Sequence, residues 1–117
     1  MKMNGIMIGS EDPKRLADYY TNVFGKPEMD EGGFTGWKIG EAWVTVAPHD
    51  QVKGKNTSPG RIIWNVETPD LKSDFEKFKA AGATVVQEPY QPRDGGDMWV
   101  CTFSDPDDNY FQLMSPM

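Results

Sequence analysis

The sequence has few of the residues that bind metal ions or attack substrates. It contains one histidine, His49, and one cysteine, Cys101, among 117 residues. A single cysteine excludes an intramolecular disulfide, which fits a reducing compartment, so we expect a cytoplasmic protein. A divalent metal site needs about three or four protein donors. The sequence therefore shows no recognisable metal or nucleophile constellation.

Long apolar runs and basic clusters are also missing from the sequence. It has no stretch of about 18 apolar residues, which a membrane-spanning helix would need, and no signal-like N-terminus. Its 12 Lys and Arg residues stand against 18 Asp and Glu residues, which gives a net charge of −6. A nucleic-acid-binding protein needs a basic face. We therefore expect a soluble protein that binds neither nucleic acid nor a membrane.

The composition that remains is that of a globular domain. Hydrophobic residues make up 38% of the chain and charged residues 26%, a balance that differs from that of disordered chains. We expect a single domain over residues 1–117, long enough to bury its own core. The 12 glycines and nine prolines predict many turns and short strands.

The first half of the chain predicts one strand, one helix and further strands. Gly5–Ser10 is a short apolar run of strand length. A helix is predicted to begin at Pro13, after capping side chains, and to end before Gly25. Two strand candidates follow, at residues 34–39 and 42–47. A polar segment, residues 49–60, has no periodicity and is predicted to be a linker.

The second half repeats the same order of elements. Residues 61–67 predict a strand, and Thr68 and Pro69 predict the cap and first position of a helix that ends at Gly82. The later strands are predicted at residues 84–87, 98–104 and 110–114, with a turn at 105–109 before the last. The chain therefore divides into a first module, residues 1–48, the linker, and a second module, residues 61–117. This order predicts sheets covered by helices on one face.

Two segments carry a family resemblance. Residues 10–25 are similar to a first-helix pattern of an Asp, an aromatic–Tyr pair and a closing Gly, and residues 103–113 to an Asp-Pro-Asp-Gly-Asn turn and the strand after it. The chain resembles the vicinal oxygen chelate superfamily, also called the glyoxalase/bleomycin-resistance/dioxygenase fold. That resemblance implies an α+β fold of two βαβββ modules whose curled mixed sheets surround a central cavity. It also implies a homodimer.

Many members of that superfamily hold a divalent metal in the cavity. The resemblance places the usual ligand positions at Gly5, Arg61 and Gln112, and near residues 45–47. Glycine offers no donor, and arginine is a cation that does not deprotonate in proteins. Only Gln112 could coordinate, through one neutral oxygen. We therefore expect neither the family's metal site nor a cofactor.

Alternation along the strands predicts the residues that line the cavity. If Arg61 and Gln112 point inward, the ligand cavity is lined by Met7, Trp43, Thr45, Arg61, Ile63, Asn65, Tyr110, Gln112 and Met114. The alternate residues, Ile6, Ile8, Ile62, Trp64, Val66, Phe111 and Leu113, should then pack under the helices. Such a lining suits a small organic ligand, and the acidic charge and four tryptophans favour a cationic or aromatic one. The same residues could instead fill a core or a dimer interface.

Three polar residues have both a functional and a plain structural interpretation. Arg61 could anchor an anionic or carbonyl oxygen of a ligand, or pair with an acidic neighbour. His49 could act as a general base, although a surface loop histidine is the commoner case. Cys101 has no nearby activating group in the sequence and is expected to be a small buried hydrophobe.

Three functions stay open at this point. The first is a metal-independent small-molecule-binding protein. The second is an enzyme of the same superfamily, a lyase, isomerase or dioxygenase with an atypical metal site, for which Gln112, His49 and an acid such as Glu41 would have to converge. The third is an interaction or regulatory module whose open sheet face binds another protein.

Overall fold

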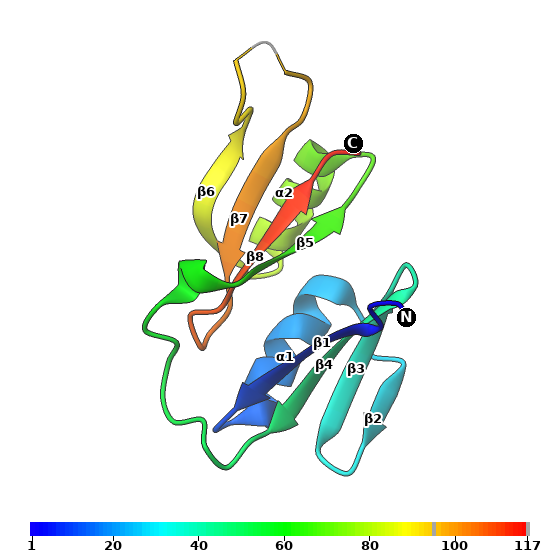
Figure 1. Cartoon of the computed structure of the whole chain (residues 1–117), viewed down its shortest axis with the longest axis vertical. Helices are drawn as coiled ribbons and strands as arrows, with labels where there is room; N and C mark the ends of the chain where they lie inside the picture. The colour runs from blue at the N-terminus through cyan, green and yellow to red at the C-terminus, as the bar shows by residue number, and fades with distance from the viewer. Residues whose placement is uncertain (95, 117) are drawn as a thin grey trace. The chain divides into compact units, whose positions relative to one another are not determined.

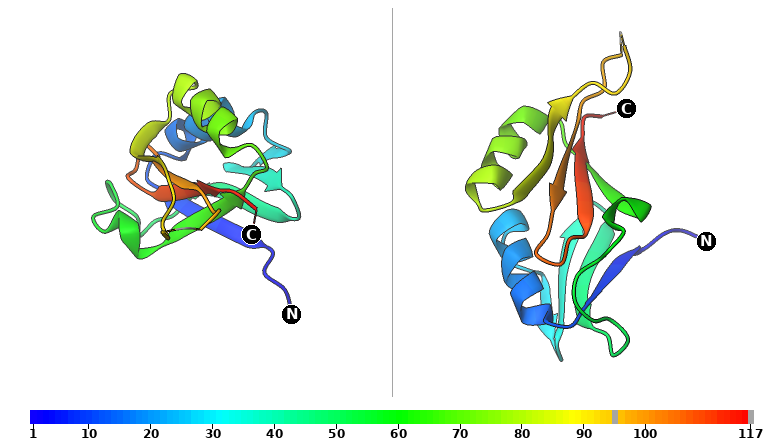
Figure 2. Two further views of the ribbon diagram at one scale, coloured as in Figure 1. Left: turned by 90° about the horizontal axis from the view of Figure 1, so that it is seen from above. Right: turned by 90° about the vertical axis from the view of Figure 1, so that its left-hand side faces the viewer.

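The computed structural model describes residues 1–94 and 96–116, and it divides the chain into two compact units, Met1–Lys55 and Asn56–Met117. Each unit is an α+β structure with one four-stranded mixed sheet and one α-helix (Figure 1). Neither sheet closes on itself. The two views in Figure 2 show each helix against one face of its own sheet.

The first unit follows the predicted order and adds one short strand. Its sheet has the order β1-β4-β3-β2, with β1 parallel to β4 and the other neighbours antiparallel. Its elements are β1 (Gly5–Ser10), α1 (Pro13–Phe24), β2 (Met29–Glu31), β3 (Phe34–Ile39) and β4 (Ala42–Pro48). The sequence did not predict β2, because its three residues, two of them acidic, carry no strand signal.

Local hydrogen bonds and a buried aromatic pair fix α1 on its sheet. Asp12 caps the helix by accepting a hydrogen bond from the Arg15 amide at 3.2 Å, and Pro13 follows at the first helical position, as predicted. The Tyr20 ring packs 6.0 Å from the ring of Trp37, and Trp37 Nε1 donates to the Gly25 carbonyl at 2.8 Å. Trp37 therefore holds the end of α1 against β3.

The second unit repeats the topology of the first. Its sheet has the order β5-β8-β7-β6, and β5 runs parallel to β8. Its elements are the 3₁₀ helix η1 (Pro59–Arg61), β5 (Ile63–Glu67), α2 (Leu71–Ala80), β6 (Thr84–Tyr90), β7 (Val100–Ser104) and β8 (Tyr110–Met114). The structure thus confirms the predicted last strand, and β6 continues three residues further than predicted.

An aromatic cluster forms the core between α2 and its sheet. Phe103 is fully buried, with ring centroids 5.6 Å from both Phe75 and Phe78 on α2 and 5.5 Å from Phe111 on β8. Stacked and tilted rings at this spacing contribute more than their buried area alone. This cluster joins the helix to the two central strands of the sheet.

The turn before β8 is stabilised by one buried carboxylate. Asp105 Oδ1 accepts hydrogen bonds from the amides of Asp107 at 2.8 Å and Asn109 at 3.0 Å. Asp108 has a positive φ of 61°, a conformation that Asp and Asn tolerate better than most residues. The predicted turn at residues 105–109 is confirmed, and Asp105 serves it as an anchor.

Two predicted helix and strand starts are wrong. Arg61 belongs to η1, where its amide donates to the Ser58 carbonyl at 3.0 Å, because Pro59 opens a short helical turn. Ile62 lies just before β5 and is 75% exposed, so it does not pack under a helix. The cap of α2 is Asp70 and not Thr68, and its carboxylate accepts from the Ser73 amide at 3.3 Å.

No helix among the residues that the structure describes is long and apolar enough to cross a membrane.

Truncating the centre of the aromatic cluster tests this account of the core. Phe103→Ala removes a fully buried ring and should lower the free energy of unfolding by about 3–5 kcal/mol. Phe34→Ala, at a position 43% exposed, should cost below about 1 kcal/mol. Urea denaturation followed by circular dichroism gives both values. Equal losses in the two variants would contradict the assignment of Phe103 to the core.

Candidate functional site

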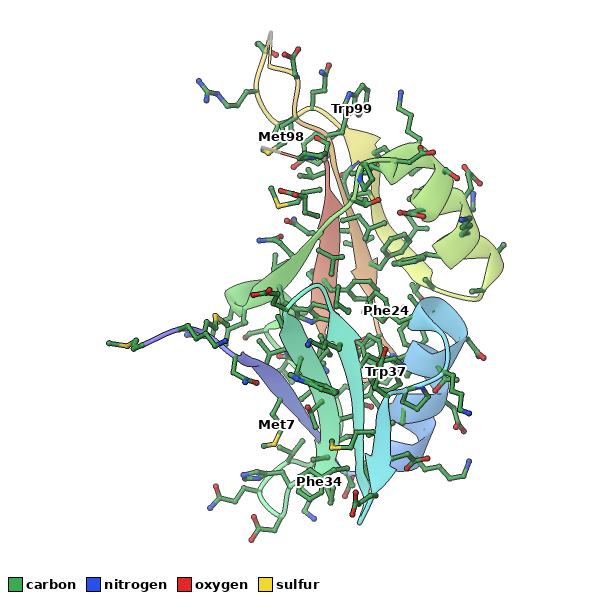
Figure 3. The ribbon with its side chains drawn as sticks, turned by 90° about the vertical axis from the view of Figure 1, so that its right-hand side faces the viewer. Met7, Phe24, Phe34, Trp37, Met98 and Trp99 are labelled. Atoms are coloured by element: carbon green, nitrogen blue, oxygen red, sulfur yellow. The ribbon has the colours of Figure 1, made fainter. Side chains whose placement is uncertain are left out.

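The strand register places three of the predicted lining residues on one face of the first sheet. Met7 is opposite Thr45 and Gly5 is opposite Trp43 in the parallel pair of β1 and β4. Val44 and Val46, which alternate with them, are buried on the face that α1 covers. Figure 3 shows Trp37 between the sheet and α1, and Met7 on the side away from α1. We call this side the helix-free face of the first sheet.

Trp43 lies against the neighbouring strand on the helix-free face. A methyl group built on Gly36 of β3 would lie 3.3 Å from Trp43 Cε3 and 3.2 Å from Met29 Cε. The missing side chain of Gly36 therefore leaves room for the tryptophan ring and for the thioether. The ring is only half-buried, and Met7 nearby on β1 is 57% exposed. Sequence reasoning missed Met29, because β2 was not predicted.

The second sheet has a corresponding helix-free face. Ile63 is opposite Tyr110, and Asn65 is opposite Gln112, in the parallel pair of β5 and β8. Gln112 Nε2 donates to the Thr102 hydroxyl on β7 at 3.2 Å. The last predicted lining residue on these strands, Met114, is opposite Glu67 and follows the same alternation. Whether these residues contact a ligand stays a prediction.

Arg61 does not belong to a strand of the second sheet. It ends η1 two residues before β5 begins and is exposed. The inward orientation expected for it rested on its opening a strand. The structure corrects the strand start, and the orientation of the side chain stays a prediction. Gln112, half-buried on β8, lies at its expected place in the strand alternation.

His49 and Glu41 lie at opposite ends of β4. His49 follows the strand directly and Glu41 precedes it, so seven residues of extended chain separate them. At about 3.3 Å per residue, the eight steps from Glu41 to His49 cover a distance of about 26 Å. His49 Nδ1 accepts from the Gln51 amide at 3.2 Å and lies 3.7 Å from Asp50 Oδ1. His49 and Glu41 therefore do not converge within the chain.

Cys101 lies on the helix-covered side of the second sheet. It has no solvent exposure, and it is opposite Leu113 in the antiparallel pair of β7 and β8. Burial raises the pKa of the Cys101 thiol to about 11, and a backbone hydrogen bond at Leu113 only partly opposes this shift. A thiol in this environment stays protonated at neutral pH, so the structure supports the reading of Cys101 as a buried hydrophobe.

Comparison with known proteins assigns the chain to a family. Its sequence matches the glyoxalase-like domain family over residues 5–114. The chain belongs to this family. The resemblance to the vicinal oxygen chelate superfamily is thereby confirmed, and the two-sheet architecture agrees with it. No match was found among curated proteins.

Several solved structures share the fold of this glyoxalase-like chain. TioX from Micromonospora sp. ML1 has a TM-score of 0.78 at 17% identity, with both chains fully covered. A glyoxalase/bleomycin resistance protein/dioxygenase family enzyme from Burkholderia phytofirmans PsJN has a TM-score of 0.76 at 18% identity, also with full coverage. A glyoxalase/bleomycin resistance protein/dioxygenase from Alicyclobacillus acidocaldarius has a TM-score of 0.76 at 13% identity. The match covers 97% of this chain and 90% of the Alicyclobacillus chain. At these identities the likeness shows the fold alone.

The first of the family's usual ligand positions cannot hold a side chain in this glyoxalase-like domain. A methyl group built on Gly5 would lie 2.0 Å from the Trp43 carbonyl oxygen, far inside van der Waals contact. The Trp43 amide donates to the Asn4 carbonyl at 2.9 Å and keeps the two strands at this spacing. Within residues 1–94 and 96–116, no three His, Cys, Asp or Glu side chains gather closely enough to bind a metal ion.

Adding a methyl group at Gly5 tests this close approach of β1 and β4. Gly5→Ala should lower the free energy of unfolding by about 3 kcal/mol, because either strand must move to relieve the overlap. Gly60→Ala is the matched control, since no atom lies within 4 Å of the added carbon. It should change stability by about 1 kcal/mol at most. Thermal and urea unfolding of both variants give the comparison.

The environment of Cys101 predicts slow thiol chemistry. At pH 8, three units below a pKa of about 11, the folded protein should leave Ellman's reagent unreacted for hours. In 6–8 M urea, a range chosen to unfold the chain, the thiol should react at the rate of a free cysteine. The absorbance at 412 nm over time measures the reaction. Rapid labelling of the folded protein would contradict the assigned burial.

Proposed function

We propose that this glyoxalase-like protein binds a small organic molecule on the helix-free face of its first sheet and does so without the family's divalent metal. The observation that carries the proposal is the packing of Trp43 over Gly36, which keeps a half-buried aromatic ring on that face. Met7 and Met29 place polarizable thioethers on the same face. Apolar and aromatic surfaces with a few polar groups are typical of small-molecule sites.

The donor set supports a site without metal. Gly5 has no room for any side chain, and Arg61 is an exposed cation on a 3₁₀ helix. Thr45 offers only a neutral hydroxyl, and the Gln112 amide is hydrogen-bonded to Thr102. A divalent ion in a protein site is held by several anionic or imidazole donors. These residues do not fit such an ion.

The nature of the ligand follows from the same residues. Trp43 and the two methionines favour a flat aromatic group, which gains stacking and dispersion contacts with them. The net charge of −6 would add a long-range attraction for a cationic ligand. We therefore propose an aromatic ligand, with a cationic substituent as the favoured one. The family resemblance leads us to propose a homodimer as the state in which it binds.

The enzyme alternative has less support. Related structures carry enzyme names, but Glu41 and His49, which the enzyme hypothesis brings together, lie at opposite ends of β4. The buried Cys101 is equally unsuited to act as a nucleophile. Binding without turnover therefore agrees better with the side chains present.

Titration of Trp43 variants with naphthalene probes tests the proposal. 1-Naphthylmethylamine, 2-naphthol and 2-naphthoate carry the same ring with a cationic, neutral or anionic substituent. In ¹⁵N–¹H correlation spectra, a bound probe should shift the signals of residues on β1 and β4. Trp43→Ala should weaken the affinity for the probes about 3-fold to 10-fold, the size of one aromatic contact.

Trp99→Phe is the matched control for the titration. The Trp99 ring lies under the Lys72 ammonium, with the nitrogen 4.1 Å from the ring centroid, and Lys72 belongs to α2 in the other unit. This variant should bind all three probes like the original protein. If Trp43→Ala binds the probes unchanged, or if the shifted signals lie elsewhere, the proposed site is wrong.

A further inference from the structure

A groove of about 610 Å³ lies on the helix-covered side of the first sheet. One wall is a stripe along α1, formed by Pro13, Ala17 and Thr21 with their charged neighbours. The other wall is the segment that leads into β2, and Thr35 of β3 also contributes to the lining. Asp30 is opposite Thr35, and Thr35 is opposite the buried Val46. The groove is therefore separate from the helix-free face and from every residue of the proposed site.

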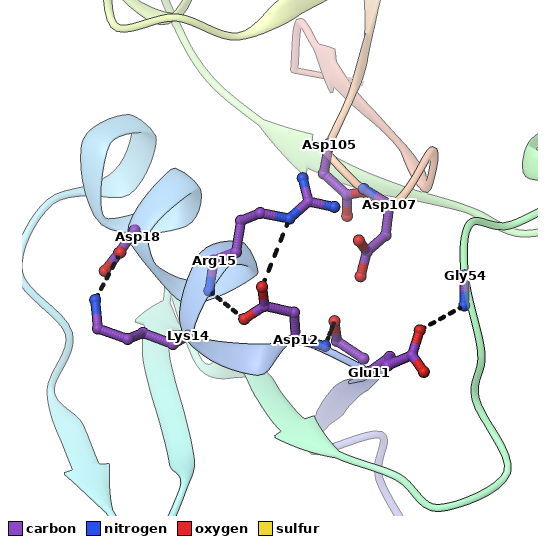
Figure 4. Close-up of polar contacts among 9 residues, drawn as sticks. Glu11, Asp12, Lys14, Arg15, Asp18, Gly54, Asp105 and Asp107 are labelled. Atoms are coloured by element: carbon purple, nitrogen blue, oxygen red, sulfur yellow. Dashed lines mark hydrogen bonds and ion pairs between the residues drawn. The ribbon is translucent and has the colours of Figure 1, made fainter.

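Four charged residues line the groove, and two of them are already paired. Lys14 Nζ donates to Asp18 Oδ2 at 3.0 Å along α1, which Figure 4 shows. This hydrogen bond raises the pKa of Lys14, so that pair remains charged and mutually compensated. Lys26 and Asp30 form no ion pair with any residue in 1–94 or 96–116. They leave one free ammonium and one free carboxylate on the same wall.

The two free charges have a defined order along the groove. α1 and the segment from Gly25 to β2 run in opposite directions (Figure 1). Lys26 follows closely on the last turn of α1, whereas Asp30 is in the middle of β2. Asp30 lies four positions after Lys26, so their Cα atoms lie no more than about 14 Å apart. An elongated molecule with charges at its two ends could contact both.

We propose that this groove binds a short peptide with free termini and apolar side chains, its carboxylate at Lys26 and its ammonium at Asp30. The termini of an extended tripeptide lie about 7–10 Å apart, which the two side chains can span. Pro13, Ala17 and Pro27 give the lining more apolar than polar surface, and they would contact the side chains of the peptide. The volume falls within the range of about 300–1,000 Å³ typical of small-ligand sites.

The edge strand strengthens the case for a peptide over other dipolar molecules. β2 is the last strand of its sheet, so its outward backbone groups have no strand partner in the first unit. An extended peptide beside β2 could form main-chain hydrogen bonds with these groups, as in other cases of strand addition. Asp30 and Pro27 would otherwise serve only to protect this edge from self-association. Peptide binding and edge protection predict different results when the Asp30 carboxylate is neutralised.

Titration with three forms of one tripeptide tests the proposal. Alanyl-leucyl-alanine carries both charges, its N-acetyl form lacks the ammonium, and its C-terminal amide lacks the carboxylate. In ¹⁵N–¹H correlation spectra, the free tripeptide should shift the signals of Ala17, Thr21 and Thr35. Each blocked form should bind about 3-fold to 5-fold more weakly, as expected for the loss of one exposed ion pair.

Two variants assign each end of the peptide. Lys26→Gln should bind the free tripeptide and its amide equally, and Asp30→Asn should bind the free tripeptide and its N-acetyl form equally. Lys53→Gln is the control, because Lys53 pairs with Glu11 at 3.8 Å outside the groove. This variant should bind the free tripeptide more tightly than either blocked form, as the original protein does. Equal affinity of the original protein for all three peptides would overturn the proposal, as would no shift at 10 mM peptide. Dimerisation of Asp30→Asn without peptide binding would overturn it in favour of edge protection.

Discussion

The parallel pairing of the first and last strand in each unit determines which side chains face α1 or α2 and which face away. β1 pairs with β4 from Gly5–Trp43 to Ser10–Pro48, and β5 pairs with β8 from Ile63 to Glu67. A slip of one residue would turn every side chain of a strand to the other face. In the first unit the Gly5 backbone touches that of Trp43 so closely that no side chain fits between them. This contact is a feature of the register and also removes the first of the family's usual ligand positions.

Much of the fold could be predicted because its signals are local. The bounds of β1 and β8, the proline at the start of α1 and the turn at Asp105 all follow from short runs of residues. The errors arose where two local signals compete. Pro69 looked like a first helical residue, but Asp70 caps α2. Pro59 opens a 3₁₀ turn that draws Arg61 out of the strand.

Less of the candidate site could be predicted, because it depends on how neighbouring strands lie side by side. Alternation alone placed Met7, Trp43 and Thr45 together. It could not show that Gly36 lies beneath the Trp43 ring, since that requires the register of β3 against β4. The groove beside α1 depends likewise on β2, a strand too short and too acidic to be recognised in the sequence. Both sites are thus made by residues that are distant in the chain.

We propose that the ligand positions which the family resemblance assigns to this chain do not hold a divalent metal ion. Native mass spectrometry of protein purified without chelator, after addition of equimolar Zn²⁺, Ni²⁺ or Fe²⁺ and desalting, tests it most directly. Our account predicts a chain mass without a bound divalent ion, in the monomer or the dimer. One ion retained per chain would contradict it, and would point to donors around His49 and Gln112 instead.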